Sequence, residues 1–266
     1  MFKNEILFWR QRAKLFWIKD GDANTKYFHL SANERRRQNT IAGLFDSNGV
    51  WCVEDRQMED VILKYFGDLF QSSRYSDFEK VISTIPTVIS QELNQSLVSD
   101  ITADEVFQAL KQMHPSKSPG PDGFSPCFYQ KFWNIVGADV VDAIRCFMSS
   151  EERLQVVNET FVTLIPKVHV PKHMHQLRPI SLCNVIYKLG SKVLANRIKP
   201  VMDMVISPFQ GVFVPGRIIS DNSIVAFELA HFMKNRRSGN KGYGALKVDM
   251  SKAYDRVEWR FLEAVL

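Results

Sequence analysis

The sequence predicts an α+β fold in which helices and a small sheet are followed by one more strand and helix. Apolar residues recur at helical spacing in long stretches, and short apolar runs of strand character lie between them. The helical stretches are 54–70, 128–148 and 184–201, and the strand-like runs are 161–166, 177–182 and 245–248. The 266 residues are 45% hydrophobic and 24% charged, which is typical of a globular protein, and no apolar run is long enough to span a membrane.

The first 40 residues hold the charge imbalance of the chain. They carry nine Lys or Arg and four Asp or Glu, which equals the net charge of +5 of the whole sequence. Residues 1–38 are predicted to be helical with a break at 20–24, and aromatic residues alternate with basic ones up to Arg35, Arg36 and Arg37. This pattern indicates a nucleic-acid contact, and a solvated basic face explains it equally well.

The sequence predicts three regions: a basic helical one over 1–70, a linker over 71–99 and a domain over 100–266. Residues 40–53 are predicted to form a hairpin around Asp46-Ser-Asn-Gly. The linker is polar and irregular. A capping box, Thr102-Ala-Asp-Glu, then opens a helix that runs through Met113.

The loop 115–126 holds four Pro and two Gly in twelve residues, among them Pro119, Gly120 and Gly123. Proline restricts the backbone and glycine permits close approach, so the loop suits contact with a phosphate backbone. A plain connector between helices remains the alternative. The cysteines contain no C-x-x-C pair, which predicts free thiols in a reducing compartment. The N-terminus lacks a signal-peptide pattern. We therefore expect an intracellular protein, nuclear or cytoplasmic.

No acidic residue occurs between Glu159 and Asp203, although this stretch holds seven Lys or Arg. Within it, Lys188 and Lys192 are one helical turn apart, and the two ammonium groups favour a bound anion such as nucleic acid. The stretch 168–175 also contains three histidines. No Cys or carboxylate lies near enough to complete a metal site with them, so a mobile loop is the preferred interpretation.

The final stretch, A-L-K-V-D-M-S-K-A-Y-D-R at 245–256, is predicted to form a short buried strand that ends at Asp249. A carboxylate at the end of a strand is held in position yet left open, so it suits a metal-binding catalytic role. Mg²⁺ binds carboxylate and phosphate oxygens together with water, and arginine binds triphosphates through two hydrogen bonds. A nucleotidyl transferase is therefore chemically reasonable.

The order of the motifs adds a resemblance to the reverse transcriptases of non-LTR (LINE-type) retrotransposons, particularly those of plants. The matching strings are S-P-G-P-D-G-F at 118–124, L-I-P-K at 164–167, R-P-I-S-L-C-N-V-I-Y-K at 178–188, S-K-V-L-A-N-R-I at 191–198, Q-G-V-F-V-P-G-R at 210–217 and K-V-D-M-S-K-A-Y-D at 247–255. The resemblance implies the fingers and the first palm strand and helix of a right-hand polymerase. It also implies an RNA template, a DNA primer, deoxynucleoside triphosphates and Mg²⁺.

The resemblance also implies roles for single residues. Asp249 would be the first metal-binding aspartate, with the Met250 carbonyl as a further ligand. Tyr254 would pack under the incoming sugar and reject a 2′-hydroxyl. Lys167 and Arg178 would contact the triphosphate. Gln210, Gly211 and Arg217 would line the template and nucleotide pocket. The Pro/Gly loop with Pro119, Gly120 and Gly123 would lie near the template.

One departure from the family limits the expected activity. The family's second catalytic element carries two adjacent aspartates, and no Asp-Asp pair occurs in the 266 residues. We therefore expect an N-terminal fragment of the polymerase that does not extend primers alone. Two other hypotheses stay open: a non-catalytic remnant that binds RNA through 1–40 and 160–202, and a degenerate gene product without function.

Overall fold

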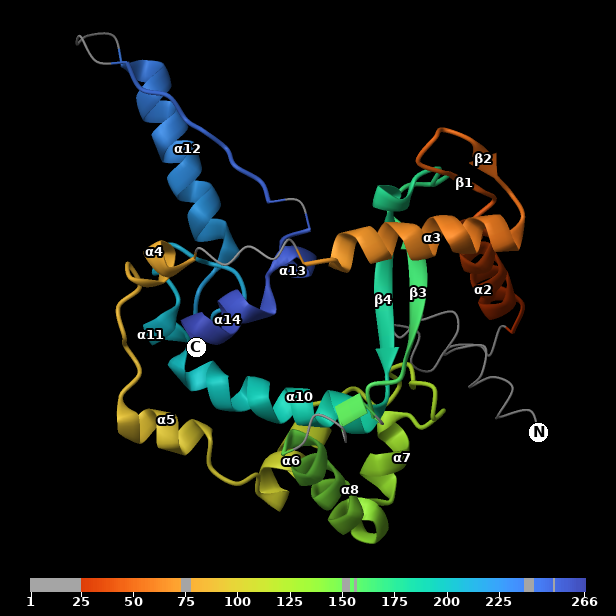
Figure 1. Ribbon diagram of the computed structural model, residues 1–266, viewed down its shortest axis with the longest axis horizontal. Coiled ribbons are helices and arrows are strands. Elements are labelled where there is room, and N and C mark those ends of the chain that lie inside the picture. Colours follow the sequence, from red (N-terminus) through yellow and green to blue (C-terminus); the bar gives the residue numbers. More distant parts are fainter. Residues whose placement is uncertain (1–24, 73–77, 150–153, 156, 237–241, 251) are drawn as a thin grey trace.

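The computed structural model describes residues 25–72, 78–149, 154–155, 157–236, 242–250 and 252–266. Figure 1 shows three groups of elements: an N-terminal group around α3, a helical group around α10 and a C-terminal group around α12. Helices and two small antiparallel sheets make up the described part of the chain, which confirms the α+β class.

The N-terminal group consists of α2 (Thr25–Asn39), β1 (Leu44–Phe45), β2 (Trp51–Cys52) and α3 (Asp55–Phe70). The β1–β2 hairpin turns where the Asp46 carboxylate accepts hydrogen bonds from the backbone N–H groups of Asn48 (2.8 Å) and Val50 (2.7 Å). Gly49 supplies the positive φ, +81°, that the turn needs. The predicted hairpin and the helix after it are both confirmed.

A long hairpin, β3 (Thr160–Pro166) and β4 (Leu177–Cys183), connects the helical group to the N-terminal group (Figure 1). Its tip carries the short η1 (Met174–Gln176). There Leu44 of β1 is buried with Met174 and Leu177, and apolar side chains of α3 pack against them. The N-terminal group therefore shares a core with the tip of the β3–β4 hairpin.

The main core lies between α6 (Ala103–Lys111), α7 (Pro126–Lys131), α8 (Trp133–Met148) and α10 (Val185–Ile198). Val106, Leu110, Ile144 and Leu189 are fully buried there. The predicted capping box forms at the start of α6. The single helix predicted over 128–148 is divided, because Phe132 leaves the helical backbone geometry (φ −109°, ψ 20°) between α7 and α8.

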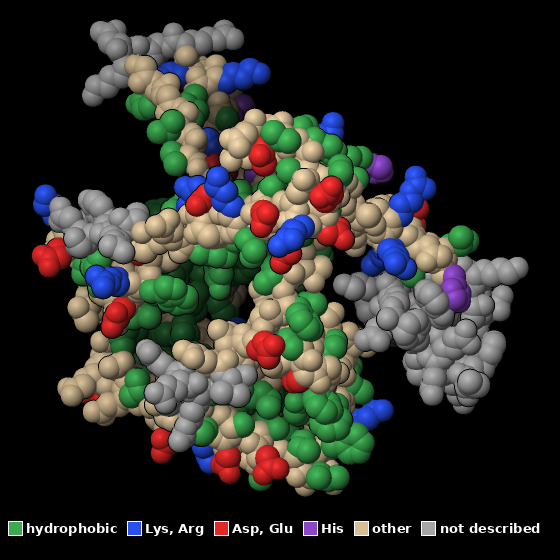
Figure 2. Space-filling view, turned by 45° about the vertical axis from the view of Figure 1, so that its right-hand side comes forward, with side chains coloured by type: hydrophobic (Ala, Val, Ile, Leu, Met, Phe, Trp, Pro, Cys, Tyr) green, Lys and Arg blue, Asp and Glu red, His purple; other side chains and the backbone are tan. Residues whose placement is uncertain are grey.

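Two short helices, α4 (Glu79–Ile82) and α5 (Gln91–Leu97), lie within the stretch predicted as a linker, and neither has a buried residue. The C-terminal group comprises η2 (Lys199–Val201), α11 (Met202–Val205), α12 (Ile219–Asn235), α13 (Ala253–Arg256) and α14 (Trp259–Val265). Figure 2 shows hydrophobic side chains on the surface of the projecting α12. No helix among the described residues is long and apolar enough to cross a membrane.

The structure contradicts the buried strand predicted over 245–248. Residues 242–250 are without regular structure and run beside α12 in Figure 1, with Leu246 89% and Val248 80% exposed. A strand needs a neighbouring strand for its backbone N–H and C=O groups. Within the described residues no strand pairs with this segment. Its apolar side chains at 246 and 248 therefore face solvent and do not pack into a core among the described residues.

Candidate active site

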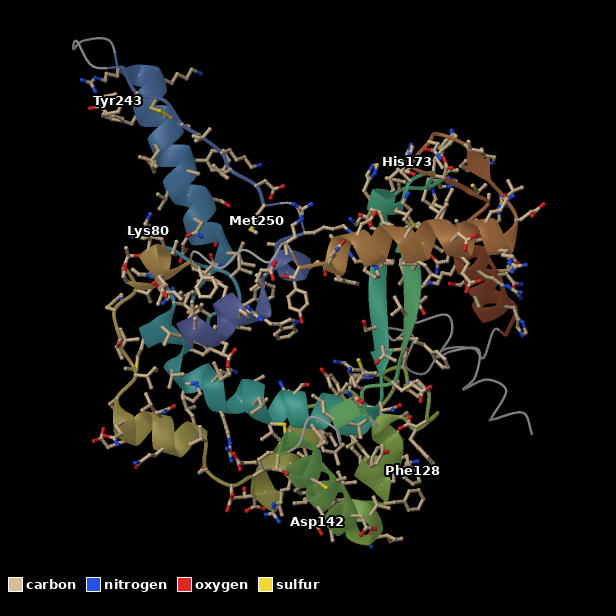
Figure 3. All side chains as sticks on the ribbon, in the orientation of Figure 1. Lys80, Phe128, Asp142, His173, Tyr243 and Met250 are labelled. Atoms are coloured by element: carbon tan, nitrogen blue, oxygen red, sulfur yellow. The ribbon has the colours of Figure 1, made fainter. Side chains whose placement is uncertain are left out.

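Asp249 lies near the end of the segment 242–250, shortly before α13. Its side chain is exposed and makes no hydrogen bond or ion pair with the parts of the protein that the structure describes. Met250, next to it, is exposed as well and lies between α12 and the C-terminal end of α3 in Figure 3. A carboxylate that no protein group engages is available to bind a cation.

A cavity of about 630 Å³ lies between the C-terminal end of α3 and the segment from Met250 to Trp259. Met250 and Asp255 line it from one side and Asp68 from the other. The described residues contain no cluster of three or more His, Cys, Asp or Glu side chains that could hold a metal ion. Asp249 therefore stands as a single carboxylate and is not part of a preformed metal cage.

Tyr254, on α13, has the most exposed aromatic ring of this region, at 94% of its surface. No ring contact to it occurs among the described residues. The phenol ring is thus open to a ligand. Its predicted contact with a sugar is compatible with this placement and remains a prediction.

The Pro/Gly loop 115–126 packs against the junction of β4 and α10. The Asp122 N–H donates to Oδ1 of Asn184 at 3.2 Å, and the Lys188 ammonium donates to the Ser118 carbonyl at 3.0 Å. Gly120 is buried, and it lies so close to α10 that a Cβ at this position would be 2.4 Å from the Asn184 backbone nitrogen. Glycine thus permits the close approach expected of this loop, and the backbone it approaches is protein.

Lys188 and Lys192 have different surroundings, although both lie on α10. Burial lowers the pKa of Lys188, whose ammonium is held by the loop carbonyl of Ser118. Lys192 is half-buried and makes no hydrogen bond or ion pair within the described chain. The two lysines therefore do not form one open pair of charges, and contact with nucleic acid stays a prediction for each.

Lys167 and Arg178 come together at the upper end of the β3–β4 hairpin. Arg178 lies opposite Ile165 in the hairpin, and Lys167 lies two residues after Ile165. Because side chains alternate along a strand, those of Lys167 and Arg178 lie on the same face. The Lys167 ammonium donates to the His175 carbonyl at 3.0 Å. Arg178 is exposed and its guanidinium has no partner among the described residues, so it can bind an anion.

Arg217 holds the loop that contains Gln210 and Gly211. Its guanidinium forms an ion pair with Asp203 (2.7 Å) and donates to the carbonyls of Ser207 and Gln210 at 2.5 and 2.9 Å. A further bond reaches the Ile206 carbonyl at 3.2 Å. The structure therefore shows Arg217 stabilising the loop. Any contact with a nucleotide stays a prediction.

Arg35, Arg36 and Arg37 are exposed in the last turns of α2 and make no ion pair within the described chain. Figure 1 places α2 and α13 at opposite ends of α3, so these arginines lie far from Asp249. His173 stacks between the rings of Phe45 (5.2 Å between centroids) and His175 (5.5 Å). These two histidines thus pack in the tip of the hairpin.

Known proteins resemble the chain over most of its length. A family described as reverse transcriptase (RNA-dependent DNA polymerase) matches residues 170–266. The Transposon TX1 uncharacterized 149 kDa protein of Xenopus laevis is 30% identical over 257 residues, which are 96% of this chain and 19% of that protein. Residues 170–266 therefore carry a reverse transcriptase domain, and the chain is related to proteins of non-LTR retrotransposons.

A second relative of the chain is the retrovirus-related Pol polyprotein from type-2 retrotransposable element R2DM of Drosophila melanogaster. It is 30% identical over 141 residues, which are 53% of this chain and 12% of that protein. The chain thus spans about a fifth or less of these relatives. The family match contains Arg178, Asp249 and Tyr254, whereas Lys167 and the loop 115–126 precede it. The plant subtype remains a prediction.

Sequence reasoning missed the structural roles of two residues that organise the chain. Asn184 fixes the loop 115–126 at the start of α10, and Arg197 joins α10 to Glu105 of α6 through bonds of 2.6 and 2.9 Å. Each partner lies more than sixty positions away in sequence. Helical spacing and capping patterns carry no information over such separations, so no local signal could have revealed these contacts.

Proposed function

We propose that the chain forms the fingers and the first catalytic element of the palm in an RNA-directed DNA polymerase. That enzyme adds deoxynucleotides to a DNA primer on an RNA template. The main support for this proposal is the placement of Asp249. This residue lies inside the stretch that matches the reverse transcriptase family, and its carboxylate is exposed and makes no hydrogen bond or ion pair with the residues that the structure describes.

The chain is proposed to consist of a basic N-terminal region over 1–70, a linker over 71–99 and a partial polymerase domain over 100–266. Mg²⁺ fits the donors at its proposed site, because the Asp249 carboxylate and the Met250 carbonyl both offer oxygen. When bound, the ion would neutralise charge on the phosphates that react. Other side chains of the chain are proposed to hold and orient the nucleotide beside the ion.

Three elements are proposed to hold the incoming nucleotide. Arg178, exposed beside Lys167 on one face of the hairpin, would bind the triphosphate. The open ring of Tyr254 would lie under the sugar and exclude a 2′-hydroxyl. Gln210 and Gly211 would line the pocket, in a loop that Arg217 keeps folded.

The template is proposed to follow the surface formed by the loop 115–126 and the first turns of α10. Pro119, Gly120 and Gly123 shape this loop, and the lysines at 188 and 192 add positive charge beside it. We expect no primer extension by the 266 residues alone, because they contain one candidate metal-binding aspartate and no Asp-Asp pair.

RNA binding without catalysis is a second candidate function. Arginines 35–37 of α2 favour it, since they are exposed, make no ion pair with the described residues and add a positive surface that a metal site does not require. This candidate and the polymerase share nucleic-acid binding. They differ in whether Asp249 takes part.

Fluorescence anisotropy with a labelled DNA primer annealed to an RNA template tests the proposed function. The affinity should fall linearly with salt on logarithmic axes, because phosphate contacts release counterions. Arg178→Ala should reduce the slope by about one, the loss of one phosphate contact. Lys80→Ala, an exposed lysine of α4 at the other side of the molecule (Figure 3), is the matched control and should leave the slope unchanged. Absence of binding at low salt would contradict both candidate functions.

A further inference from the structure

Lys252 is the residue that the proposed chemistry leaves unexplained. It follows the Asp249 segment directly and precedes α13, with a left-handed backbone (φ 53°, ψ 46°) that is uncommon for a residue other than glycine. Its ammonium nitrogen is buried and has no hydrogen-bond partner among the described residues. Two unfavourable features at one residue indicate that its surroundings determine its position.

The surroundings of the ammonium are aromatic rings of α3. The Lys252 nitrogen lies 4.6 Å from the centre of the Tyr65 ring and 5.8 Å from that of Phe66. The face of an aromatic ring attracts a cation, and the attraction is stronger where water is excluded. The two rings thus compensate part of the loss of hydration that burial imposes on the ammonium.

Two further contacts join the same two segments of chain. The Ser72 hydroxyl donates to the Glu258 carboxylate at 2.7 Å, just beyond the C-terminal end of α3. Phe78 meets Phe261 edge to face, with 6.0 Å between ring centres. Residues 65–78 therefore touch residues 252–261 at three successive points, and Figure 1 shows α13 beside the C-terminal end of α3.

We propose that α3 anchors the Asp249 segment through Lys252, so that the N-terminal region sets the position of the catalytic motif. Lys252 is then a positioning residue, and its buried ammonium is out of reach of any ligand. The Asp249 side chain makes no hydrogen bond or ion pair with the described residues, so its place is fixed by the chain on either side of it. The anchor stands on contacts alone, and its consequence for catalysis rests on the proposed function of Asp249.

Limited proteolysis of the full chain by chymotrypsin tests the anchor. The side chains of Tyr254 and Trp259 are exposed but lie in α13 and α14, so cleavage after them requires these helices to open, and its rate follows the open fraction when reclosing is fast. Lys252→Met keeps the apolar stem and removes the charge, and should speed cleavage about three- to ten-fold. Lys252→Arg restores a cation and should restore a rate close to that of the wild type. Lys247→Met, an exposed lysine of the same motif, is the matched control and should change nothing.

A double-mutant cycle with Tyr65→Leu decides whether the ring is the partner. If Lys252 acts through Tyr65, the double variant should be cleaved no faster than the quicker single variant. Tyr65→Phe, which keeps the ring, should resemble the wild type. Cleavage after Tyr129, which is buried in the main core, reports global unfolding and should stay constant. Multiplying effects of the two changes, or equal rates for the methionine variants at 252 and 247, would overturn the proposal. The assay contains no metal or nucleic acid, so its result is independent of the proposed function.

Discussion

Arg197 shows how one side chain can assemble several elements. Its guanidinium bonds to the Glu105 carboxylate and to the carbonyls of Leu97, Ser99 and Asp100. Glu105 also closes the capping box of α6. Arg197 therefore fixes the start of α6 and the chain before it against α10, next to the main core.

This ion pair makes stability depend on pH. The hydrogen bond from Arg197 lowers the pKa of Glu105 from 4.5 to about 2. The folded carboxyl thus holds its proton less tightly than the unfolded one, so its stabilisation is present above pH 4.5 and is lost as pH falls toward 2. Glu105→Gln should lower the unfolding free energy by about 1–2 kcal/mol at neutral pH, after solvent screening is allowed for.

Urea unfolding at several pH values measures this effect. The difference between wild type and Glu105→Gln should shrink as the pH is lowered through the range between the two pKa values. Asp104→Asn changes an exposed neighbour in the same first turn and should show no comparable pH dependence. A difference between wild type and the glutamine variant that stays constant down to the lowest pH would contradict the assigned pairing.

Local patterns predicted most elements, because the signals for them lie within a few residues. The capping box at Thr102 and the turn at Asp46 both formed as expected. The strand over 245–248 failed for the opposite reason. Its alternation of apolar and polar residues is a true strand signal, yet a strand depends on a partner that lies elsewhere in space.

The sequence selected the residues of the candidate site, and their roles stay predictions. Residues that face solvent, such as Asp249, Arg178 and Tyr254, could be selected by motif, since the motif itself carries them. The contacts of Lys188, Arg217 and Lys252 could not be predicted, because each depends on residues from another element or loop. Helical spacing of lysines suggested an anion contact for Lys188, and the resemblance implied a pocket role for Arg217. The structure shows both side chains holding loops, and ligand binding stays a prediction for each.

The packing of the loop 115–126 on α10 gives a test at the scale of elements. Gly120→Ala would place a Cβ 2.4 Å from the Asn184 backbone nitrogen and 2.5 Å from the Cys183 carbonyl carbon. Backbone on both sides must move, so we expect a loss of roughly 1–3 kcal/mol in unfolding free energy. Gly67→Ala, in α3, meets nothing within 4 Å and should gain up to about 1 kcal/mol from helix propensity.

Chemical denaturation of both glycine variants provides the comparison. The two substitutions add the same methyl group, so opposite signs must arise from the local backbone and the surroundings of each glycine. Equal effects on the denaturation midpoint would show that the loop is not held against α10 as the structure has it. A fall for Gly120→Ala alone supports the contact of loop and helix.

At the scale of the whole molecule, the C-terminal group differs from the other two groups. The main core and the hairpin tip each bury a cluster of apolar side chains, whereas α12, α13 and α14 contain no buried residue. Large apolar side chains such as Phe227 and Trp259 are mostly exposed there. In the described structure, the contacts with residues 65–78 are therefore important for holding the Asp249 segment.

Asp249 is proposed to face nucleic-acid phosphates through a metal ion. Anisotropy with the RNA–DNA hybrid, comparing wild type with Asp249→Asn in EDTA and in Mg²⁺, tests it most directly. In EDTA the bare carboxylate repels phosphate, so Asp249→Asn should bind about two- to five-fold more tightly. Mg²⁺ should remove that difference by improving wild-type binding, and Asp255→Asn should behave as wild type. If Mg²⁺ affects the wild type and Asp249→Asn equally, Asp249 does not bind the ion, which contradicts its proposed role.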